Sequence, residues 1–348
     1  MKLKKLKINK FSKIFLFGHN GLIGSSIFKA LKKKGYKKVY TFEKNILDLL
    51  NQKKIQIAFK KYNPDAVIIA AARVGGVMAN KKFPYNFIYE NLAIQNNIIH
   101  ASARNAVKKL IFLGSSCIYP KKWKKPFIEN DLTLSGLDKT NEPYAVAKIA
   151  GLKMCHAYNQ QFHSNVPKFI TLIPPNLFGP KDNYNEHNSH VLAAMLRKFY
   201  ISKISNKKEV IIWGSGKPKR EFMHSDDVGK IIANFLEVPD KVLLSFTKGK
   251  FSHFNIGCMR DYSIRELANI IKKITSFEGK IKYDSNYPDG VTRKLLNSSL
   301  LTKIFPDIKK MDLSNKHLFE KKIEKTYKEL TLSLLKNFEK NSSYNLPI

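Results

Sequence analysis

Three glycines at a spacing of three residues, Gly18, Gly21 and Gly24, lie near the start of the chain. They follow a short apolar run at 13–17, which is typical of a buried strand, and they open a helical pattern over 21–34. In such a turn one glycine permits the tight bend, one lets the backbone approach a pyrophosphate, and one lets the helix pack against the strand. The free N–H groups and the positive dipole end of the helix would then attract phosphate. The sequence therefore predicts a dinucleotide site at the end of the first strand.

The first half of the chain alternates short apolar runs with helical patterns, which indicates βαβ units and a parallel sheet. We therefore predict an α/β fold, a Rossmann doubly wound parallel sheet with a smaller C-terminal α/β substrate-binding domain. Further strands are expected at 38–42, 66–71, 110–113 and 169–173, and helices at 53–62, 86–106 and 143–162.

After Pro174 and Pro175 the pattern becomes less regular, and we place the domain boundary there. Residues 1–176 form the expected Rossmann domain, with 1–12 a frayed basic leader. Residues 177–348 form the expected substrate-binding domain, in which about 220–240 packs back on the first. The expected elements are helices at 190–199, 225–236, 263–275 and 319–338, a strand at 209–213 and a loop at 214–220.

The bulk composition is that of a globular protein, with 43% hydrophobic and 26% charged residues among 348. Three cysteines provide no disulfide framework, and no apolar run is long enough to cross a membrane. The apolar segment after the basic N-terminus is too short for a signal peptide, so we expect a cytoplasmic protein. The net charge of +35 could indicate nucleic-acid or membrane binding, or only a lysine-rich composition. Because the lysines are spread along the chain without a nucleic-acid-reading motif, we favour the second reading and expect neither partner.

Tyr144 and Lys148 lie four residues apart in the helix expected at 143–162. This spacing places a phenol and an ammonium on one helix face, one turn apart. A cation there would lower the pKa of the phenol and prepare it for proton transfer. The spacing alone is weak evidence, because a half-buried tyrosine beside a solvated lysine would look the same.

The strand expected at 110–113 runs into a segment that contains Ser115 and Cys117. Ligands of open α/β sheets sit beyond the carboxyl ends of the strands, so these side chains should face the crevice. The Ser115 hydroxyl could donate to a substrate carbonyl or alkoxide. Cys117 could exchange protons with carbon acids, although from composition alone packing of a small residue is the favoured explanation.

The cofactor's ribose should lie near Glu43 and Lys44, at the end of the second strand. An acid there favours NAD and a cation favours NADP, so these two residues indicate opposite answers. Asp48 and Leu49 are placed to reach the adenine, but Asp48 could equally be a helix N-cap.

The chain resembles the extended short-chain dehydrogenases/reductases through its three glycines, Ser115, Tyr144 and Lys148. Within them it is similar to the GDP-L-fucose synthase family, whose members are GDP-4-keto-6-deoxy-D-mannose 3,5-epimerase/4-reductases. The narrower resemblance runs from about residue 13 to about residue 300. It rests on the strings AAARVGG at 70–76, GSSCIYP at 114–120, NEPYAVAK at 141–148, NSHV at 188–191, WGSG at 213–216, REF at 220–222 and PDG at 288–290.

This resemblance implies a role for each catalytic residue. Tyr144 would protonate the C4 oxygen as hydride arrives, Lys148 would assist it and hold the nicotinamide ribose, and Ser115 would orient the C4 carbonyl. Cys117 and His190 would be the acid/base pair for epimerisation at C3 and C5. The implied cofactor-binding residues are Gly18, Asn20, Gly21, Leu22, Ile23, Gly24, Lys44, Asp48, Leu49, Ala71, Lys148, Pro174, Asn176, Leu177 and His190.

The resemblance also implies GDP-4-keto-6-deoxy-D-mannose as substrate, GDP-L-fucose as product, NADP(H) as cofactor and no metal. It implies a homodimer, formed through the helices expected at 86–106 and 143–162. Asn20 and Phe42 stand where bacterial members can carry Arg for a 2′-phosphate, so NAD(H) remains an alternative. A related NAD(P)-dependent reductase or epimerase acting on another nucleotide sugar is the alternative function. The implied substrate-binding residues are Asn176, Lys198, Trp213, Arg220 and Asp289.

Overall fold

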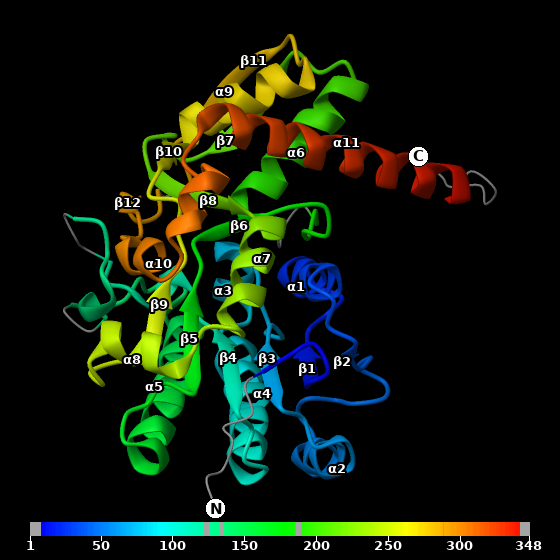
Figure 1. Cartoon of the computed structure of the whole chain (residues 1–348). Coiled ribbons are helices and arrows are strands. Elements are labelled where there is room, and N and C mark those ends of the chain that lie inside the picture. Colours follow the sequence, from blue (N-terminus) through cyan, green and yellow to red (C-terminus); the bar gives the residue numbers. More distant parts are fainter. Residues whose placement is uncertain (1–7, 122–124, 133–134, 186–188, 288, 342–348) are drawn as a thin grey trace, which may run out of the picture.

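The larger part of the molecule is one six-stranded sheet with helices on both faces (Figure 1). The computed structural model describes residues 8–121, 125–132, 135–185, 189–287 and 289–341. The strand order is β2-β1-β3-β4-β5-β9, and every neighbouring pair is parallel. The order reverses between β1 and β3, which places a ligand crevice at the carboxyl ends of these strands. The strands are β1 Lys13–Phe17, β2 Lys38–Tyr40, β3 Ala66–Ile69, β4 Lys109–Leu113, β5 Phe169–Ile173 and β9 His253–Asn255.

Side chains of the strands alternate between two apolar cores, one on each face of the sheet. Ile14 and Leu16 of β1 face a core shared with α1 and α7. Phe15 and Phe17 face a core shared with α2, α4 and α5. Burial of both faces explains why the strands read as continuous apolar runs. The helices are α1 Leu22–Lys33, α2 Gln52–Tyr62, α4 Pro84–Arg104, α5 Glu142–His163 and α7 Ser225–Phe235.

Helix α7 comes from the second half of the chain but packs against α1. The Oγ atoms of Ser26 and Ser225 lie 2.9 Å apart. A Cβ atom on Gly229 would lie 2.7 Å from the backbone of Ser26, so only glycine permits this close approach of the two helices. The segment at 225–235 thereby completes the helical layer on one face of the sheet.

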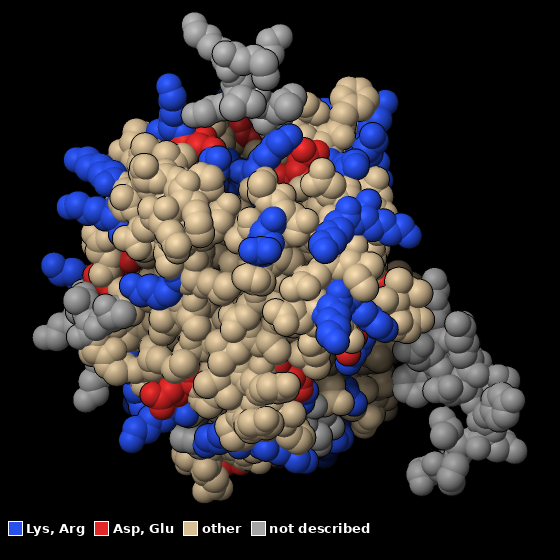
Figure 2. Space-filling model, turned by 90° about the horizontal axis from the view of Figure 1, so that it is seen from below, with Lys and Arg blue, Asp and Glu red and all other residues tan. Residues whose placement is uncertain are grey.

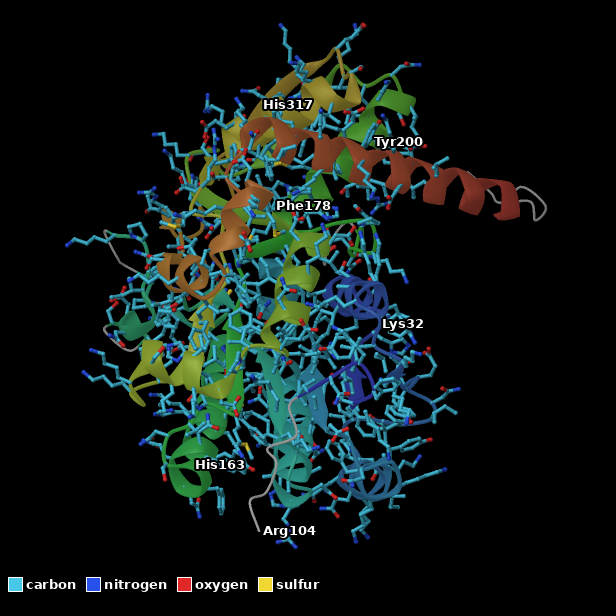
Figure 3. The ribbon with its side chains drawn as sticks, in the orientation of Figure 1. Lys32, Arg104, His163, Phe178, Tyr200 and His317 are labelled. Atoms are coloured by element: carbon cyan, nitrogen blue, oxygen red, sulfur yellow. The ribbon has the colours of Figure 1, made fainter. Side chains whose placement is uncertain are left out.

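The smaller part of the molecule has its own apolar core, to which strands of two small sheets contribute side chains. Phe178 belongs to this core, packs edge-on against Phe319 and His224, and lies near the middle of the molecule in Figure 3. The sheets contain β6 Asn176–Phe178, β8 Lys219–His224, β10 Asp261–Ser263 and β12 Arg293–Lys294, and β7 Glu209–Trp213 with β11 Lys280–Asp284. The helices of this core are α6 Val191–Ile204, α9 Ile264–Thr275 and α11 Lys316–Asn341. Shorter helices elsewhere are α3 Val77–Lys82, α8 Asp240–Thr247 and α10 Ser299–Ile304.

The α/β fold and the order of the long elements agree with the sequence predictions. The first strand is confirmed at its predicted bounds, and the helix predicted at 143–162 spans Glu142–His163. The prediction of a loop through 214–220 is wrong at its end, because β8 begins at Lys219. Strand β9 was not predicted. It lies after the segment at about 220–240 that we expected to pack on the first domain, and it pairs with β5. Strands of two or three residues are too short to show a period of their own.

Positive side chains are distributed widely over the face of the molecule seen in Figure 2. Figure 2, viewed from the lower end of Figure 1, shows Lys and Arg around the whole face with acidic residues between them. Within the described part of the chain, no helix is both long enough and apolar enough to pass through a membrane.

Candidate active site

The three glycines of the turn after β1 lie in three different steric surroundings. Gly18 adopts φ +86°, and a Cβ atom there would lie 2.6 Å from the backbone nitrogen of Ala71. A Cβ atom on Gly24 would lie 1.9 Å from the carbonyl oxygen of Gly18, so the helix can approach the turn only with glycine there. A Cβ atom on Gly21 would meet only that same oxygen, at 3.5 Å. The space over Gly21 is therefore open, as the backbone approach of a pyrophosphate requires.

Glu43 is held against the glycine turn by two side chains of that turn. Asn20 donates to both of its carboxylate oxygens, at 3.1 and 2.9 Å, and the Nε2 atom of His19 lies 3.1 Å from one of them. These bonds lower the pKa of Glu43, so the group carries its negative charge at neutral pH. Asn20 thus holds an acid beside the turn, and both this acid and the neighbouring Lys44 are exposed.

The loop after β2 ends at helix α2, whose N-cap is Asn51, with a side chain that accepts from Lys54 N–H. The alternative reading of Asp48 as this cap is therefore wrong. Asp48 instead accepts from the N–H of Leu50 at 3.0 Å in the preceding turn. The carbonyl oxygen of Leu49 accepts from Asn97 on α4, which ties this loop to the sheet layer.

Tyr144 and Lys148 lie one turn apart on α5, but the pKa of the phenol is not lowered as we predicted. Burial raises it, charge at Cys117 adds to the rise, and a hydrogen bond with Ser115 opposes it. Burial also lowers the pKa of Lys148 to about 7, so this lysine is only partly charged at neutral pH. Its nitrogen lies 5.8 Å from the centroid of the Tyr144 ring. A weak and distant cation cannot offset the desolvation of the phenol.

Cys117 lies in a short 3₁₀ helix, Ser116–Ile118, directly after β4. The backbone N–H of Cys117 donates to the Ser115 hydroxyl oxygen at 3.3 Å, and the Nδ2 atom of Asn141 donates to the Cys117 sulfur at 3.2 Å. An ionised Cys117 would raise the pKa of both Tyr144 and Arg220, so the fold brings these three groups near one another.

His190 is the N-cap residue of α6, and the residue is partly buried. Burial lowers the pKa of its imidazole, which is therefore neutral at pH 7. No hydrogen bond joins His190 to Cys117 within the described residues. Asn188 and Pro288, which belong to two of the resemblance strings, lie outside them.

Among the residues implied in substrate binding, we distinguish a first group around Arg220 and a second group around Trp213. Burial lowers the pKa of Arg220, and charges at Cys117, Asp138 and Asp289 oppose the change. In the second group, the Trp213 ring stacks on Tyr287 with ring centroids 4.3 Å apart. The Lys198 ammonium lies 4.4 Å from the centroid of the Trp213 ring.

Asp289 accepts from the backbone N–H and the hydroxyl of Ser215 at 2.9 and 2.6 Å. Its charge also acts on Arg220. Asp289 therefore holds the loop after β7 by hydrogen bonds, and its charge opposes the fall in the pKa of Arg220.

The segment after β5 passes between the two parts of the molecule. The carbonyl oxygen of Pro174 accepts from Ser116 N–H at 3.2 Å, next to Cys117. The Asn176 side chain donates to the Glu221 carbonyl oxygen at 3.0 Å, and Leu177 packs against the first core.

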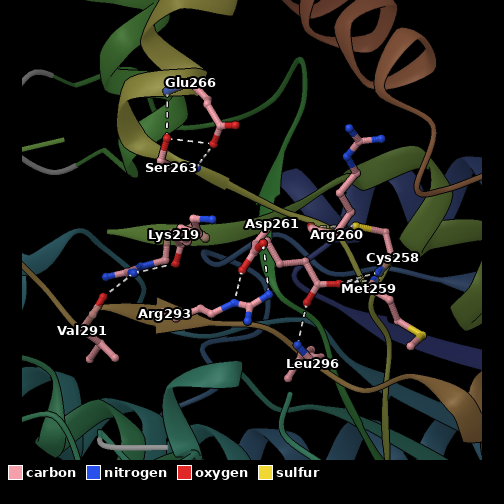
Figure 4. Close-up of polar contacts among 12 residues, drawn as sticks. Lys219, Cys258, Met259, Arg260, Asp261, Ser263, Glu266, Val291, Arg293 and Leu296 are labelled. Carbon is pink, nitrogen blue, oxygen red and sulfur yellow. Dashed lines mark hydrogen bonds and ion pairs between the residues drawn. The ribbon is translucent and has the colours of Figure 1, made fainter. Parts of the chain in front are cut away.

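Sequence reasoning missed Glu221, a fully enclosed carboxylate that organises the loops around Arg220. It accepts backbone N–H groups of Cys258, Met259 and Leu296 at 2.6, 2.8 and 2.9 Å, contacts drawn in Figure 4. Burial raises its pKa to about 7, and these hydrogen bonds oppose the rise. Sequence reasoning also gave no function to Asn141 or Tyr287. Asn141 and Glu221 lie inside the strings at 141–148 and 220–222, but their contacts are with residues distant in sequence, which no local pattern reveals.

The family profile described as NAD dependent epimerase/dehydratase family matches residues 14–257, and the chain belongs to this family. Among curated relatives, the GDP-L-fucose synthase of Escherichia coli (strain K12) is 43% identical over 289 residues. That match spans 83% of this chain and 89% of the relative.

Solved structures are similar over nearly the whole chain. A GDP-6-OMe-4-keto-L-xylo-heptose reductase from C. jejuni has a TM-score of 0.85 and 34% identity, covering 94% of this chain and all of that one. A GDP-L-fucose synthetase from Naegleria fowleri, bound to NADP, has a TM-score of 0.79 and 27% identity, covering 96% of each chain.

Proposed function

We propose that this protein converts GDP-4-keto-6-deoxy-D-mannose to GDP-L-fucose, by epimerisation at C3 and C5 followed by NADPH-dependent reduction at C4. The observation that carries the proposal is the cluster of Ser115, Cys117, Tyr144 and Arg220 beyond β4, on the same sheet edge as the glycine turn. The relationship to the bacterial GDP-L-fucose synthase supports this substrate.

The dinucleotide, when bound, supplies the hydride for C4. The open space at Gly21 fits its pyrophosphate, and Gly18 and Gly24 shape the turn. Lys148 would hold the nicotinamide ribose. The other cofactor-binding residues implied by the resemblance would also contact the dinucleotide.

Epimerisation would use the acidity that the C4 ketone confers on the neighbouring C–H bonds. Cys117 and His190 would remove a proton from one face of the sugar and return one to the other. A neutral imidazole can accept that proton, and burial keeps His190 neutral.

Reduction would follow without movement of the sugar. Ser115 would donate a hydrogen bond to the C4 oxygen, and Tyr144 would give its proton to that oxygen as hydride reaches C4. The high pKa of the phenol keeps the proton in place until the alkoxide forms.

Two variants separate the half-reactions. Cys117→Ser should slow solvent-deuterium incorporation at C3 and C5, measured by mass spectrometry, while leaving cofactor binding intact. Tyr144→Phe should retain that incorporation but lose oxidation of NADPH. Incorporation at the wild-type rate in Cys117→Ser, or product formation by Tyr144→Phe, would contradict the assignment. Comparison of GDP- with dTDP- and UDP-linked sugars tests the alternative of another nucleotide-sugar substrate.

Binding of the GDP-sugar would involve Asn176, Lys198, Trp213, Arg220 and Asp289, in a domain formed mainly by residues 177–348. Residues 1–176 would form most of the dinucleotide-binding domain, completed by α7 and β9. Arg220 is suited to a diphosphate, and Trp213 to stacking on a base or sugar.

We also infer a homodimer in the cytoplasm that binds no nucleic acid. Exposed apolar side chains on α4 and α5, among them Tyr85, Tyr89 and Phe162, support pairing of these helices. Three free cysteines support a reducing compartment. The wide distribution of Lys and Arg in Figure 2 supports the absence of a nucleic-acid partner. Light scattering and titration with duplex DNA at low salt test the first and last of these inferences.

A further inference from the structure

Asn141 is a helix N-cap residue whose side chain does not cap its helix. Asparagine is favoured at this position because its oxygen can accept from a free N–H in the first turn. In α5 no such hydrogen bond forms. The Asn141 backbone alone supports the helix start, with its carbonyl oxygen accepting from Ala145 N–H at 3.0 Å. The side chain is therefore available for another function.

The side-chain amide of Asn141 is directed at the thiol of Cys117 instead. Its Nδ2 atom lies 3.2 Å from the sulfur. Its Oδ1 atom is buried and has no hydrogen-bond partner in the described part of the chain. A neutral thiol is a weak acceptor, whereas a thiolate accepts strongly, so this contact gains most when Cys117 loses its proton.

The other groups that act on Cys117 come from three elements. Ser115, after β4, accepts the Cys117 backbone N–H. Tyr144 on α5 and Arg220 on β8 are the titratable or charged groups near Cys117. An ionised Cys117 would raise the pKa of both. Among these partners of the cysteine, Asn141 is the one whose side chain donates to the sulfur atom itself.

We propose that Asn141 is a positioning residue that holds the sulfur of Cys117 and stabilises its thiolate, thereby preparing it to remove protons from carbon. The importance of this thiolate for catalysis rests on the proposed epimerisation. The hydrogen bond itself does not, and it can be tested without substrate.

The test measures alkylation of Cys117 by iodoacetamide as a function of pH, because only the thiolate reacts quickly. Cys155 and Cys258 are buried, and Cys117→Ser measures their background. The variants are Asn141→Ala and Asn141→Ser. Serine caps a helix about as well as asparagine but is too short to keep the contact with sulfur, so it separates the two possible functions of the side chain.

We expect the pH of half-maximal alkylation to rise by about one unit in both variants, so that the rate at neutral pH falls about tenfold. A wild-type profile in Asn141→Ser would overturn the proposal, even with Asn141→Ala impaired, because capping would then explain the residue. If Asn141→Ala does not fold, Asn141→Ser decides the question alone. Shifted profiles in an enzyme that exchanges no deuterium at C3 or C5 would refute the proposed function and leave this inference standing.

Discussion

The ammonium nitrogen of Lys148 lies 2.8 Å from the carbonyl oxygen of Leu113, the last residue of β4. This hydrogen bond joins helix α5 to the strand that leads into Ser115 and Cys117. The same ammonium lies 4.7 Å from the centroid of the Phe112 ring. Lys148 thus fixes the phenol of Tyr144 relative to the end of the sheet, in addition to any role in binding a cofactor.

Burial of Lys148 should make the stability of the protein depend on pH. Its pKa of about 7 in the folded state lies below the ordinary value of 10.5. Between these values the unfolded chain holds more protons than the folded one, so stability rises with pH through this window. Relative to Lys148→Met, the wild-type free energy of unfolding should rise by up to about 1 kcal/mol per pH unit from pH 7 to 9. Urea unfolding measures this, and Lys153→Met, exposed on the same helix, is the control. Parallel curves for wild type and Lys148→Met would refute the prediction.

Substitution of glycine by alanine should have different effects at two positions of the glycine turn. Gly24→Ala should destabilise the protein by roughly 2–4 kcal/mol, because its Cβ would lie 1.9 Å from a backbone oxygen. Gly21→Ala should cost less than about 1 kcal/mol, because its Cβ meets nothing closer than 3.5 Å, but it should weaken dinucleotide binding at least about tenfold. Thermal unfolding and fluorescence titration with NADPH separate the effects. Gly136→Ala, where a Cβ would meet nothing within 4 Å, is the control, and normal NADPH affinity in Gly21→Ala would count against the site.

Glu43 should influence the choice between the two nicotinamide cofactors. Its carboxylate, held by His19 and Asn20, is expected to lie near the adenosine ribose and to repel a 2′-phosphate. Glu43→Gln should strengthen binding of NADPH relative to NADH by about five- to tenfold at low salt, and less at high salt because the group is exposed. The dissociation constants of both cofactors report this ratio. Glu278→Gln, at an exposed site in the second half of the chain, should leave the ratio unchanged. An unchanged ratio in Glu43→Gln would place the ribose elsewhere.

Glu221 should be needed both for stability and for the position of Arg220. Its two oxygens accept three backbone N–H groups, so an amide in its place must direct an N–H at one of these donors. Glu221→Gln should therefore lower the free energy of unfolding by roughly 2–4 kcal/mol. Below the unfolding temperature it should raise KM for the GDP-sugar more than it lowers kcat. Glu209→Gln, at a more exposed ion pair with Lys282, should change stability by less than about 1 kcal/mol. A stability loss equal to that control would show that the carboxylate is dispensable.

Much of the fold was predictable because it follows from local patterns. The spacing of the three glycines, the apolar run of β1 and the four-residue interval between Tyr144 and Lys148 each report backbone geometry within one or two elements. The alternation of short apolar runs with helical patterns likewise indicated a parallel sheet. These features required no knowledge of distant contacts.

Tertiary structure decided what the same side chains can do. Tyr144 and Lys148 have the predicted spacing, yet burial by the surrounding chain moves the pKa of each against its charged form. Arg220 is about a hundred residues from Cys117 in sequence, and the Asn141 side chain contacts the Cys117 sulfur while making no capping hydrogen bond to its own helix. Local sequence determines backbone period and turn geometry, whereas desolvation and charge pairing depend on neighbours that only the folded chain brings together.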